Sequence, residues 1–389
     1  MKKFLAMILA LVMSLSLVAC GGSKEETKPT EEKPTETEQP AEAAGADFSV
    51  AMITDYGDIT DQSFNQTTYE ACKAYCEANG VDFSYFKPAG DSTAERVAMV
   101  ESAVDEGYTV IVMPGYAFGE TITQVADEYS DITFIALDVG EGDLGDYKLP
   151  SNVYCAVYQE ELCGYMAGYA AVKLGYTHLG FLGGMAVPAV VRYGYGFVQG
   201  CNAAAVEMGK EKEVTVEYVY GNQFFGDADI TAYMDNWYQT MGVQAVFACG
   251  GGIYTSAAEA AAKVNAKVIG VDVDQAGIIN AYGEGMTVTS AMKGLYPTTV
   301  DTLTDVIVNG NWANYAGKIE TLGLVSGDDP SANYVQLAET TLFEDGKFTA
   351  EDYAALVKGL YDGTITVSND TTAEPAVTNV NVTWLGNLK

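Results

Sequence analysis

The chain has 389 residues, of which 20 are Lys or Arg and 53 are Asp or Glu, so its formal net charge at pH 7 is −33. This excess of acidic groups excludes nucleic acid as a partner and argues against a strongly anionic ligand such as a nucleotide, because like charges repel. A neutral or cationic ligand fits the charge better.

The N-terminal residues have the order of a secretory signal. Lys2 and Lys3 precede an apolar stretch from Phe4 to Ala19, which is shorter than the roughly 18 apolar residues of a membrane-spanning helix. The sequence Leu17-Val18-Ala19-Cys20 resembles the bacterial lipobox, in which a lipid thioether forms on the cysteine before cleavage. We therefore expect residues 1–19 to be a lipoprotein signal peptide and Cys20 to carry a lipid anchor at the extracytoplasmic face of the cell membrane. A simple secretory signal with an incidental cysteine is the alternative.

Residues 20–45 differ in composition from the rest of the chain. From Gly21 to Gly45 they are almost all Glu, Thr, Pro, Lys, Gly and Ala, which leaves no large apolar side chain to bury. We expect this segment to be a disordered tether. Cleavage before Cys20 would remove Lys2 and Lys3, leaving 18 basic and 53 acidic residues and a net charge of −35.

From residue 46 onward, short β-branched runs alternate with helical stretches, as in parallel βαβ units. The strands that we predict are 48–53, 83–86, 108–113, 132–137, 178–182, 214–220, 245–248 and 268–271. Eight strands are many for one small sheet, so we predict an α/β fold with two doubly wound lobes. Polar, Gly-rich segments follow several strands, and ligands of open α/β sheets bind outside the carboxyl ends of the strands. We therefore expect a ligand cleft between the lobes.

Three helices have recognisable start signals. Ser63-Phe64-Asn65-Gln66 and Ser92-Thr93-Ala94-Glu95 both fit the capping box, in which the Ser oxygen and the Gln or Glu side chain satisfy backbone N–H groups reciprocally. Residues 349–362 predict one more capped helix, with Tyr353, Leu356 and Leu360 as its buried face.

Signatures of enzymes and metal sites are mostly missing. The chain has one histidine, His178, at the start of an apolar strand, and it contains neither a G-x-S-x-G elbow nor a G-x-x-x-x-G-K-[ST] loop. Beyond Cys20, the cysteines are scattered and lie mostly in apolar stretches: Cys72, Cys76, Cys155, Cys163, Cys201 and Cys249. A zinc pair at Cys72 and Cys76 lacks companions, so we interpret all six as buried thiols. We expect no catalytic residue, no metal and no cofactor.

Carboxylates recur where the predicted strands end. Asp55 and Asp61 bracket the first loop, Asp138 ends the fourth strand, and Asp272 and Asp274 end another. A carboxylate accepts two hydrogen bonds from a vicinal diol, so these residues suit ribose or sugar hydroxyls. Each one alone is more readily a helix cap or turn residue, but their recurrence at successive strand ends favours a binding site.

Aromatic residues also follow strands. Phe64 comes directly after the first loop, and Phe224-Phe225 follow the strand at 214–220. Such rings could stack on a flat heterocycle. By spacing alone, core packing is the better interpretation.

Several motifs, in order along the chain, resemble the basic membrane protein group of lipoproteins, the nucleoside-binding components of ABC importers. Residues 55–66, DYGDITDQSFNQ, resemble its D-x-G-x-x-D-x-S-F-N opening. Residues 158–168 look like its central helix, and residues 180–185, GFLGGM, like the strand and turn after it. GVDVDQ at 270–275 and TSAMK at 289–293 are similar to its G-V-D-x-D-Q and T-S-x-x-K segments. The bulky Tyr254 departs from the small residues usual at its position.

The resemblance implies a type I periplasmic-binding-protein fold that closes on its ligand by hinge motion. It also implies that Phe64 and Phe225 clamp the base and that Asp272 and Lys293 hold the ribose hydroxyls. The other site residues that it implies, Asp55, Asn65 and Asp138, would reach polar edges of the base or sugar. Its lobes would be residues 46–155 with about 292–325, and about 156–291 with 326–389.

The leading hypothesis is a monomeric lipoprotein that binds a nucleoside, most simply a purine nucleoside, and delivers it to the permease subunits of an ABC transporter. A receptor of the same fold for a sugar or signalling molecule is an alternative. A surface-anchored nucleoside hydrolase that uses the clustered aspartates is another.

Overall fold

The computed structural model describes residues 48–388. The predicted signal peptide, the tether and the lipidation of Cys20 lie outside the described residues. Within residues 48–388, no helix combines the length and the apolar character needed to cross a membrane.

The first sheet is entirely parallel and has the order β11-β5-β4-β3-β1-β2. We call it and its helices the N-lobe. Its strands are β1 (Ser49–Ile53), β2 (Asp82–Phe86), β3 (Val110–Pro114), β4 (Thr133–Leu137), β5 (Val153–Tyr158) and β11 (Lys318–Leu322).

The second sheet has the order β12-β10-β9-β8-β6-β7-β13, and only the pairing of β12 with β10 is antiparallel. We call it and its helices the C-lobe. Its strands are β6 (His178–Gly183), β7 (Thr215–Tyr220), β8 (Ala245–Cys249), β9 (Lys267–Asp272), β10 (Thr287–Lys293), β12 (Val335–Leu337) and β13 (Asn381–Asn387).

The two sheets share one winding pattern. Five strands of each follow the order second-first-third-fourth-fifth, β2-β1-β3-β4-β5 in the N-lobe and β7-β6-β8-β9-β10 in the C-lobe. This doubly wound order confirms the predicted fold class, and it places a topological switch point beside the first strand of each lobe. All eight predicted strands are present, whereas β5, β10, β11, β12 and β13 were not predicted. The predicted lobe boundaries stay a prediction.

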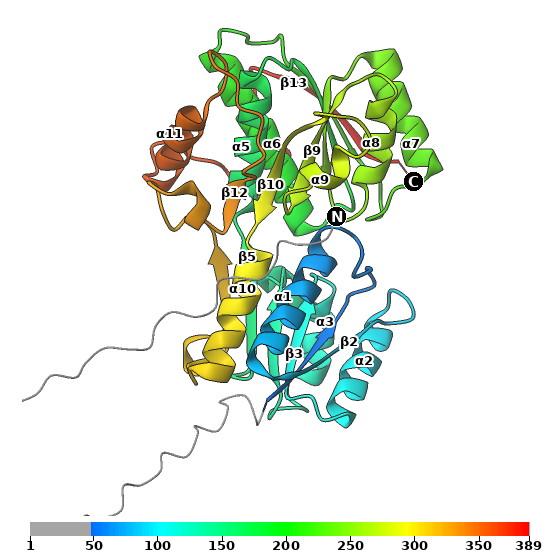
Figure 1. The fold of residues 1–389 in the computed structure, drawn as a ribbon, viewed down its shortest axis with the longest axis vertical. Coiled ribbons are helices and arrows are strands. Elements are labelled where there is room, and N and C mark those ends of the chain that lie inside the picture. The colour runs from blue at the N-terminus through cyan, green and yellow to red at the C-terminus, as the bar shows by residue number, and fades with distance from the viewer. Residues whose placement is uncertain (1–47, 389) are drawn as a thin grey trace, which may run out of the picture. The chain divides into compact units, whose positions relative to one another are not determined.

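Helices connect the strands (Figure 1). They are α1 (Phe64–Asn79), α2 (Thr93–Asp105), α3 (Phe118–Val125), α4 (Glu141–Leu144), α5 (Glu160–Lys173), α6 (Pro188–Glu207), α7 (Ala228–Asp235), α8 (Tyr254–Ala262), α9 (Ala276–Ile279), α10 (Leu295–Leu303) and α11 (Ala350–Tyr361). Short π turns extend α7 at Asn236–Met241 and α10 at Thr304–Val308, and 3₁₀ turns lie at Trp312–Asn314 and Pro330–Ala332.

All three helices begin where their start signals predict, directly after Ser63, Ser92 and Thr349, but two of their caps differ from the prediction. Thr349 and Asp352 form a reciprocal capping box at α11, whose predicted buried face is confirmed. At α2 only half of the predicted box forms: Ser92 Oγ accepts a hydrogen bond from Glu95 N, while the Glu95 carboxylate accepts one from the Ser92 hydroxyl. The capping box predicted at Ser63 is wrong. There the Asp61 carboxylate accepts the N–H groups of residues 63, 65 and 66, because the backbone turns back before the helix begins. The Ser63 hydroxyl is thereby left for another partner.

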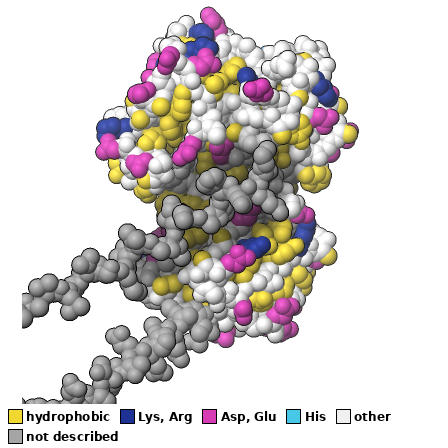
Figure 2. Space-filling view, in the orientation of Figure 1, with side chains coloured by type: hydrophobic (Ala, Val, Ile, Leu, Met, Phe, Trp, Pro, Cys, Tyr) yellow, Lys and Arg dark blue, Asp and Glu magenta, His cyan; other side chains and the backbone are white. Residues whose placement is uncertain are grey.

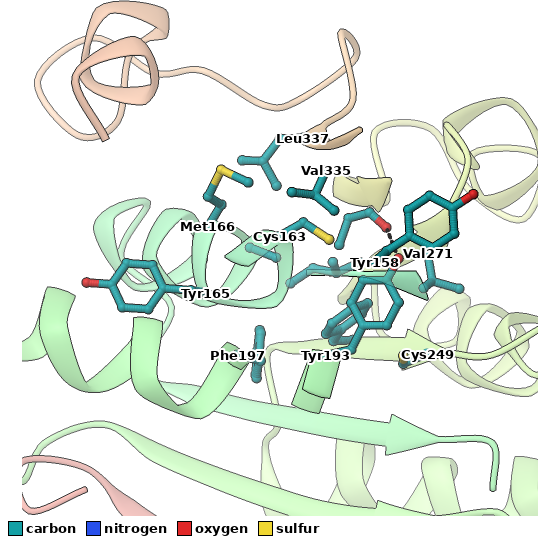
Figure 3. Close-up of a cluster of buried hydrophobic side chains, with 14 of the residues drawn as sticks. Tyr158, Cys163, Tyr165, Met166, Tyr193, Phe197, Cys249, Val271, Val335 and Leu337 are labelled. Carbon is teal, nitrogen blue, oxygen red and sulfur yellow. Dashed lines mark hydrogen bonds between the residues drawn. The ribbon is translucent and has the colours of Figure 1, made fainter. Parts of the chain in front are cut away.

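Each sheet is covered by apolar side chains on both faces. Along β1, Val50 and Met52 join one buried cluster and Ala51 and Ile53 join another, as the two-residue period of a strand requires. The six cysteines beyond Cys20 are all buried and free, which confirms their interpretation as buried thiols. Figure 3 shows Cys163 and Cys249 within the cluster that contains Tyr158 and Tyr193.

Helices α5 and α6 lie side by side in the C-lobe (Figure 1) and approach closely through glycines on both. A Cβ on Gly164 or Gly168 of α5 would lie 2.1 Å from a backbone oxygen of α6, and one on Gly196 or Gly200 would lie 2.1 or 2.0 Å from a backbone oxygen of α5. No side chain fits at these positions, so the backbones themselves are in contact. The first turns of the two helices are therefore fixed against each other.

Candidate functional site

The seven predicted site residues line one cavity of about 430 Å³. This volume is within the range of small-molecule sites, about 300–1,000 Å³. The wall combines residues that follow β1, β3, β4 and β7 with residues that end β8, β9 and β10, so it lies at the carboxyl ends of strands from both sheets. The predicted location of the cleft agrees with this arrangement, and the roles of the seven residues stay predictions.

The loop after β1 is folded by its own carboxylates. Asp55 Oδ1 accepts the N–H groups of Tyr56 at 2.7 Å and Gly57 at 2.8 Å. A Cβ on Gly57 would lie 2.2 Å from Asn65 Nδ2, so glycine is needed for the loop to pack against Asn65. Burial raises the pKa of Asp55 and raises that of Asp61 to about 6, although backbone N–H groups oppose both shifts. The local sequence thus places Asp55 and Asn65 together at the cavity wall.

Asp138 and Asp272 occupy equivalent positions in the two lobes. Asp138 directly follows the fourth strand of the N-lobe, and Asp272 ends the fourth strand of the C-lobe. Both have left-handed backbone conformations, with φ of 62° and 65°. Such a conformation is uncommon for residues other than glycine and is concentrated at functional sites. The matched geometry turns both carboxylates toward Lys293.

Lys293 ends β10, and its side chain is nearly inaccessible to solvent, at 2% exposure. Its Nζ lies 2.5 Å from Asp138 Oδ2, 3.4 Å from Glu160 Oε1 and 3.9 Å from Asp272 Oδ1. Burial opposes the charge of the ammonium, but the three carboxylates outweigh that effect and raise the pKa of Lys293. Burial raises the pKa of Asp138 to about 6 against the attraction of Lys293. The ammonium therefore stays charged at physiological pH.

Two acceptors at the cavity have no protein partner. Asn65 Oδ1 and Asp138 Oδ1 are buried, and neither receives a hydrogen bond. Leaving a buried acceptor unsatisfied costs about 1–3 kcal/mol. A ligand that brings N–H or O–H donors to this wall would satisfy both.

Aromatic rings flank these polar groups. Phe64, the first residue of α1, packs partly against the core and also lines the cavity. Its interpretation as a core residue is therefore only part of its role. Phe225 is 60% exposed and lines the cavity, as does Phe224, whose ring centroid lies 6.5 Å from that of Tyr56. The cavity can therefore present an aromatic surface from each lobe.

Several residues of this region were missed at the level of the sequence. Tyr193 lines the cavity and donates a hydrogen bond to Asp272 at 3.4 Å, and Cys249 also lines it. The Gly250–Gly252 turn, one of the Gly-rich segments from which the cleft was predicted, lines it as expected. Periodicity marks Tyr193 as one more apolar helix position, so no local signal separates it from the core. Tyr254 is buried in a core cluster on α8 and is not part of the cavity wall, so the departure at that position does not alter the cavity.

Side chains that commonly bind metals are dispersed. Among residues 48–388, no group of three or more His, Cys, Asp or Glu residues could hold a metal ion. His178 contacts Glu217 at 3.3 Å on the C-lobe sheet, away from the cavity wall.

Comparison with known proteins identifies the family. Residues 48–336, which contain every residue of the cavity wall, match the family model of Bmp, the PnrA-like ABC transporter substrate-binding proteins. The chain belongs to the Bmp family.

Among the relatives of this Bmp-family chain are a nucleoside-binding protein and a lipoprotein. It is 26% identical over 242 residues to the ABC transporter nucleoside-binding protein BmpA of Lactococcus lactis, a match that covers 59% of this chain and 65% of that relative. It is 24% identical over 334 residues to an uncharacterized lipoprotein of Pyrococcus furiosus, covering 81% of this chain and 78% of the relative.

Solved structures support the same fold. An ABC transporter solute-binding protein of Aeropyrum pernix has a TM-score of 0.62 at 23% identity, over 83% of this chain and 88% of its own. One from Conexibacter woesei has a TM-score of 0.62 at 22% identity, over 83% and 99%. The Bmp-family chain thus has the fold of these solute-binding proteins. Its role as an ABC transporter substrate-binding protein rests on the family match.

Proposed function

We propose that this protein binds a nucleoside, most simply a purine nucleoside, in the cavity between its lobes and delivers it to the permease of an ABC importer. The observation that carries the proposal is the composition of the cavity wall. Aromatic rings of both lobes surround buried carboxylates and an ammonium, and two buried acceptors lack partners. A base with N–H donors and a ribose with a vicinal diol supply the matching chemistry.

In this proposal Phe64 and Phe225 stack on the base, while Asp272 and Lys293 bind the ribose hydroxyls. Asn65 and Asp138 accept hydrogen bonds from the base or the sugar, and Asp55 contributes at the first loop. The Lactococcus lactis relative is a nucleoside-binding protein, which favours this ligand class. The Pyrococcus furiosus relative is named a lipoprotein, which supports a lipid anchor on Cys20 that holds the monomer near its permease.

Calorimetry of the purified protein, from Ala46 onward, against nucleosides and monosaccharides tests the proposal. We expect binding of purine nucleosides with one site per chain, and chromatography of the incubated mixture should recover each nucleoside intact. Tight binding of a sugar without binding of any nucleoside would overturn the proposal, and release of free base from inosine would identify a hydrolase instead.

A phenylalanine variant separates nucleoside from sugar binding within this cavity. Phe64→Ala should weaken the affinity for a purine nucleoside by about 10- to 100-fold, because it removes both the stacking contact and the apolar area of the ring. Tyr361→Ala, at a half-exposed ring on α11 outside the cavity wall, is the control and should leave affinity unchanged. An unchanged affinity in Phe64→Ala would argue against base stacking.

A further inference from the structure

Glu160 bridges two cations next to the cavity, the partly buried Arg192 and the buried Lys293. Its carboxylate is fully buried, with Oε2 at 2.7 Å from Arg192 Nε and Oε1 at 3.4 Å from Lys293 Nζ. Neither Glu160 nor Arg192 lines the cavity, whereas Lys293 does. A chain of ionic contacts thus connects α6, through the first residue of α5, to the cavity wall.

The orientation of the Lys293 ammonium depends on this chain. Asp138 and Glu160 both accept hydrogen bonds from its Nζ. The rings of Phe64, Tyr158 and Tyr193 surround the same atom at 4.8, 5.4 and 5.8 Å from their centroids. An ammonium has three N–H donors, so with two of them directed at carboxylates the direction of the third is fixed.

The charges of the cluster nearly balance only because Arg192 is present. Lys293 and Arg192 face three buried carboxylates, those of Asp138, Glu160 and Asp272. Removing the guanidinium would leave one cation for the three, an arrangement that a buried site avoids by taking up a proton. The other titratable groups around the cluster are Glu161 and Cys163 of α5, Tyr158, Tyr193, Cys249 of β8 and Asp143 of α4.

The sequence and the helix packing single out Arg192. It is one of two arginines in the chain, the other being Arg96 on α2. The glycines that bring α5 and α6 into backbone contact include Gly164 and Gly196, each one helical turn from the Glu160–Arg192 contact. The pair is therefore held by two rigid helices rather than by loops.

We propose that Arg192 and Glu160 are positioning residues of the binding site, which keep the Asp138–Lys293 pair ionised and aimed into the cavity. This inference rests on the proposed function, because it assigns the pair to the binding of the same ligand. Arg192 itself does not contact the ligand.

The consequence is a pH profile. Without Arg192 the pKa of Asp138, about 6 in the intact cluster, rises further, because the guanidinium attraction that opposes its burial is lost. Ionised Asp138 can accept hydrogen bonds from both Lys293 and the ligand, whereas protonation makes one of its two oxygens a donor. Wild-type affinity should therefore be constant above pH 7 and fall below pH 6, whereas in Arg192→Gln the fall should begin at higher pH.

Calorimetry with adenosine, guanosine and inosine between pH 5.5 and 8.5 tests this. At pH 7.5, Arg192→Gln should bind the tightest of them about 10- to 100-fold more weakly, as expected when a buried ion-pair network loses one member. Arg192→Lys keeps the charge and should restore the wild-type pH profile, even where its affinity is lower. If Arg192→Gln does not fold, failure of Arg192→Lys to keep the wild-type profile overturns the inference.

Lys173→Gln is the matched control. Lys173 contacts Glu207 at 2.8 Å and joins the same two helices at their other ends, outside the cavity wall. Its loss should change neither the affinity nor the pH profile. A wild-type profile in Arg192→Gln, with nucleoside still bound, would overturn the inference and leave the proposed function standing.

A carboxyl titration by nuclear magnetic resonance, on the unliganded protein, separates the two proposals. The Asp138 resonance, assigned through Asp138→Asn, should titrate at higher pH in Arg192→Gln than in wild type. An unchanged midpoint overturns the inference whether or not a nucleoside binds. Absence of nucleoside binding to wild type overturns the proposed function instead.

Discussion

Burial sets the chemistry of individual carboxyl groups in and around the cavity. Glu160 and Glu161 are adjacent at the start of α5, and 0% and 4% of their surfaces are exposed. Burial favours the neutral form of Glu160, but Arg192 and Lys293 outweigh it and lower its pKa. Glu161 has no such pairing, its Oε2 lacks a hydrogen bond, and burial raises its pKa to about 7. Neighbouring glutamates therefore differ in charge because their partners differ.

Glu161 should make folding stability depend on pH. Its pKa is higher in the folded protein, about 7, than the ordinary value of 4.5, so the folded state retains a proton that the unfolded state loses. Stability is therefore lost as pH rises from about 4.5 to 7. Glu161→Gln should remove this loss. The change that it causes in the free energy of unfolding should be more favourable at pH 8 than at pH 5 by about 2–3 kcal/mol.

Urea denaturation at pH 5 and pH 8 measures the effect. Glu101→Gln, at an exposed position on α2, is the control and should shift neither value by more than about 0.5 kcal/mol. Equal changes in the free energy of unfolding of Glu161→Gln at the two pH values would contradict a raised pKa.

At the scale of elements, close helix packing decides the position of the site. Gly164, Gly168, Gly196 and Gly200 allow α5 and α6 to touch along their backbones. Glycine inside a helix costs about 0.5–1 kcal/mol relative to alanine, so the packing has to offset that cost. The packing offsets this cost because the two backbones meet without a gap between the helices.

Gly168→Ala should therefore destabilise the protein. Its Cβ would lie 2.1 Å from Phe197 O, so the helices have to separate, and we expect a loss of about 2–4 kcal/mol in the free energy of unfolding. Gly277→Ala in α9, where nothing lies within 4 Å of the new Cβ, is the matched control. Alanine favours the helix there, so the control should be neutral or slightly stabilising. Equal stabilities of the two variants in urea denaturation would contradict close packing.

At the scale of the whole described body, direct contacts connect the two lobes across the cavity. Ser63 Oγ, at the start of α1, donates a hydrogen bond to Asp272 Oδ2 at 2.6 Å, and Gln275 Nε2 donates one to Gln62 O at 3.1 Å. These bonds join the loop before α1 to the end of β9 and the turn that follows it. On the face drawn in Figure 2, acidic side chains are spread over both lobes rather than gathered at one point.

Ser63→Ala should shift the unliganded protein toward open conformations, because Asp272 Oδ2 loses its donor. The radius of gyration from small-angle scattering should increase without ligand and return to the wild-type value with saturating nucleoside. Affinity should fall about 3- to 10-fold, since the ligand then supplies more of the closure free energy. Ser102→Ala, which removes a local hydrogen bond within α2, should change neither quantity. Wild-type scattering and affinity in Ser63→Ala would exclude this role for the hydroxyl.

The sequence by itself determined eight of the strands and seven residues of the cavity wall. Short runs of β-branched residues predicted eight strands, because strands that are buried on both faces of a parallel sheet are almost entirely apolar. The same pattern did not predict β10, because this strand contains Thr and Ser residues, which are polar but buried. Polar side chains after strands were found because parallel strands end at a common edge.

Only the tertiary structure decided how these residues act together. The segments IALDV at 135–139 and IGVDV at 269–273 are alike in sequence. Only the shared winding order and the matched left-handed backbone show that Asp138 and Asp272 occupy equivalent positions in the two lobes. The Ser63 hydroxyl donates a hydrogen bond to Asp272 instead of capping its own helix, because Asp61 already accepts the helix N–H groups. Arg192 carries no local signal of function. Its role depends on a contact with Glu160, 32 residues away, that exists only because four glycines allow two helices to touch.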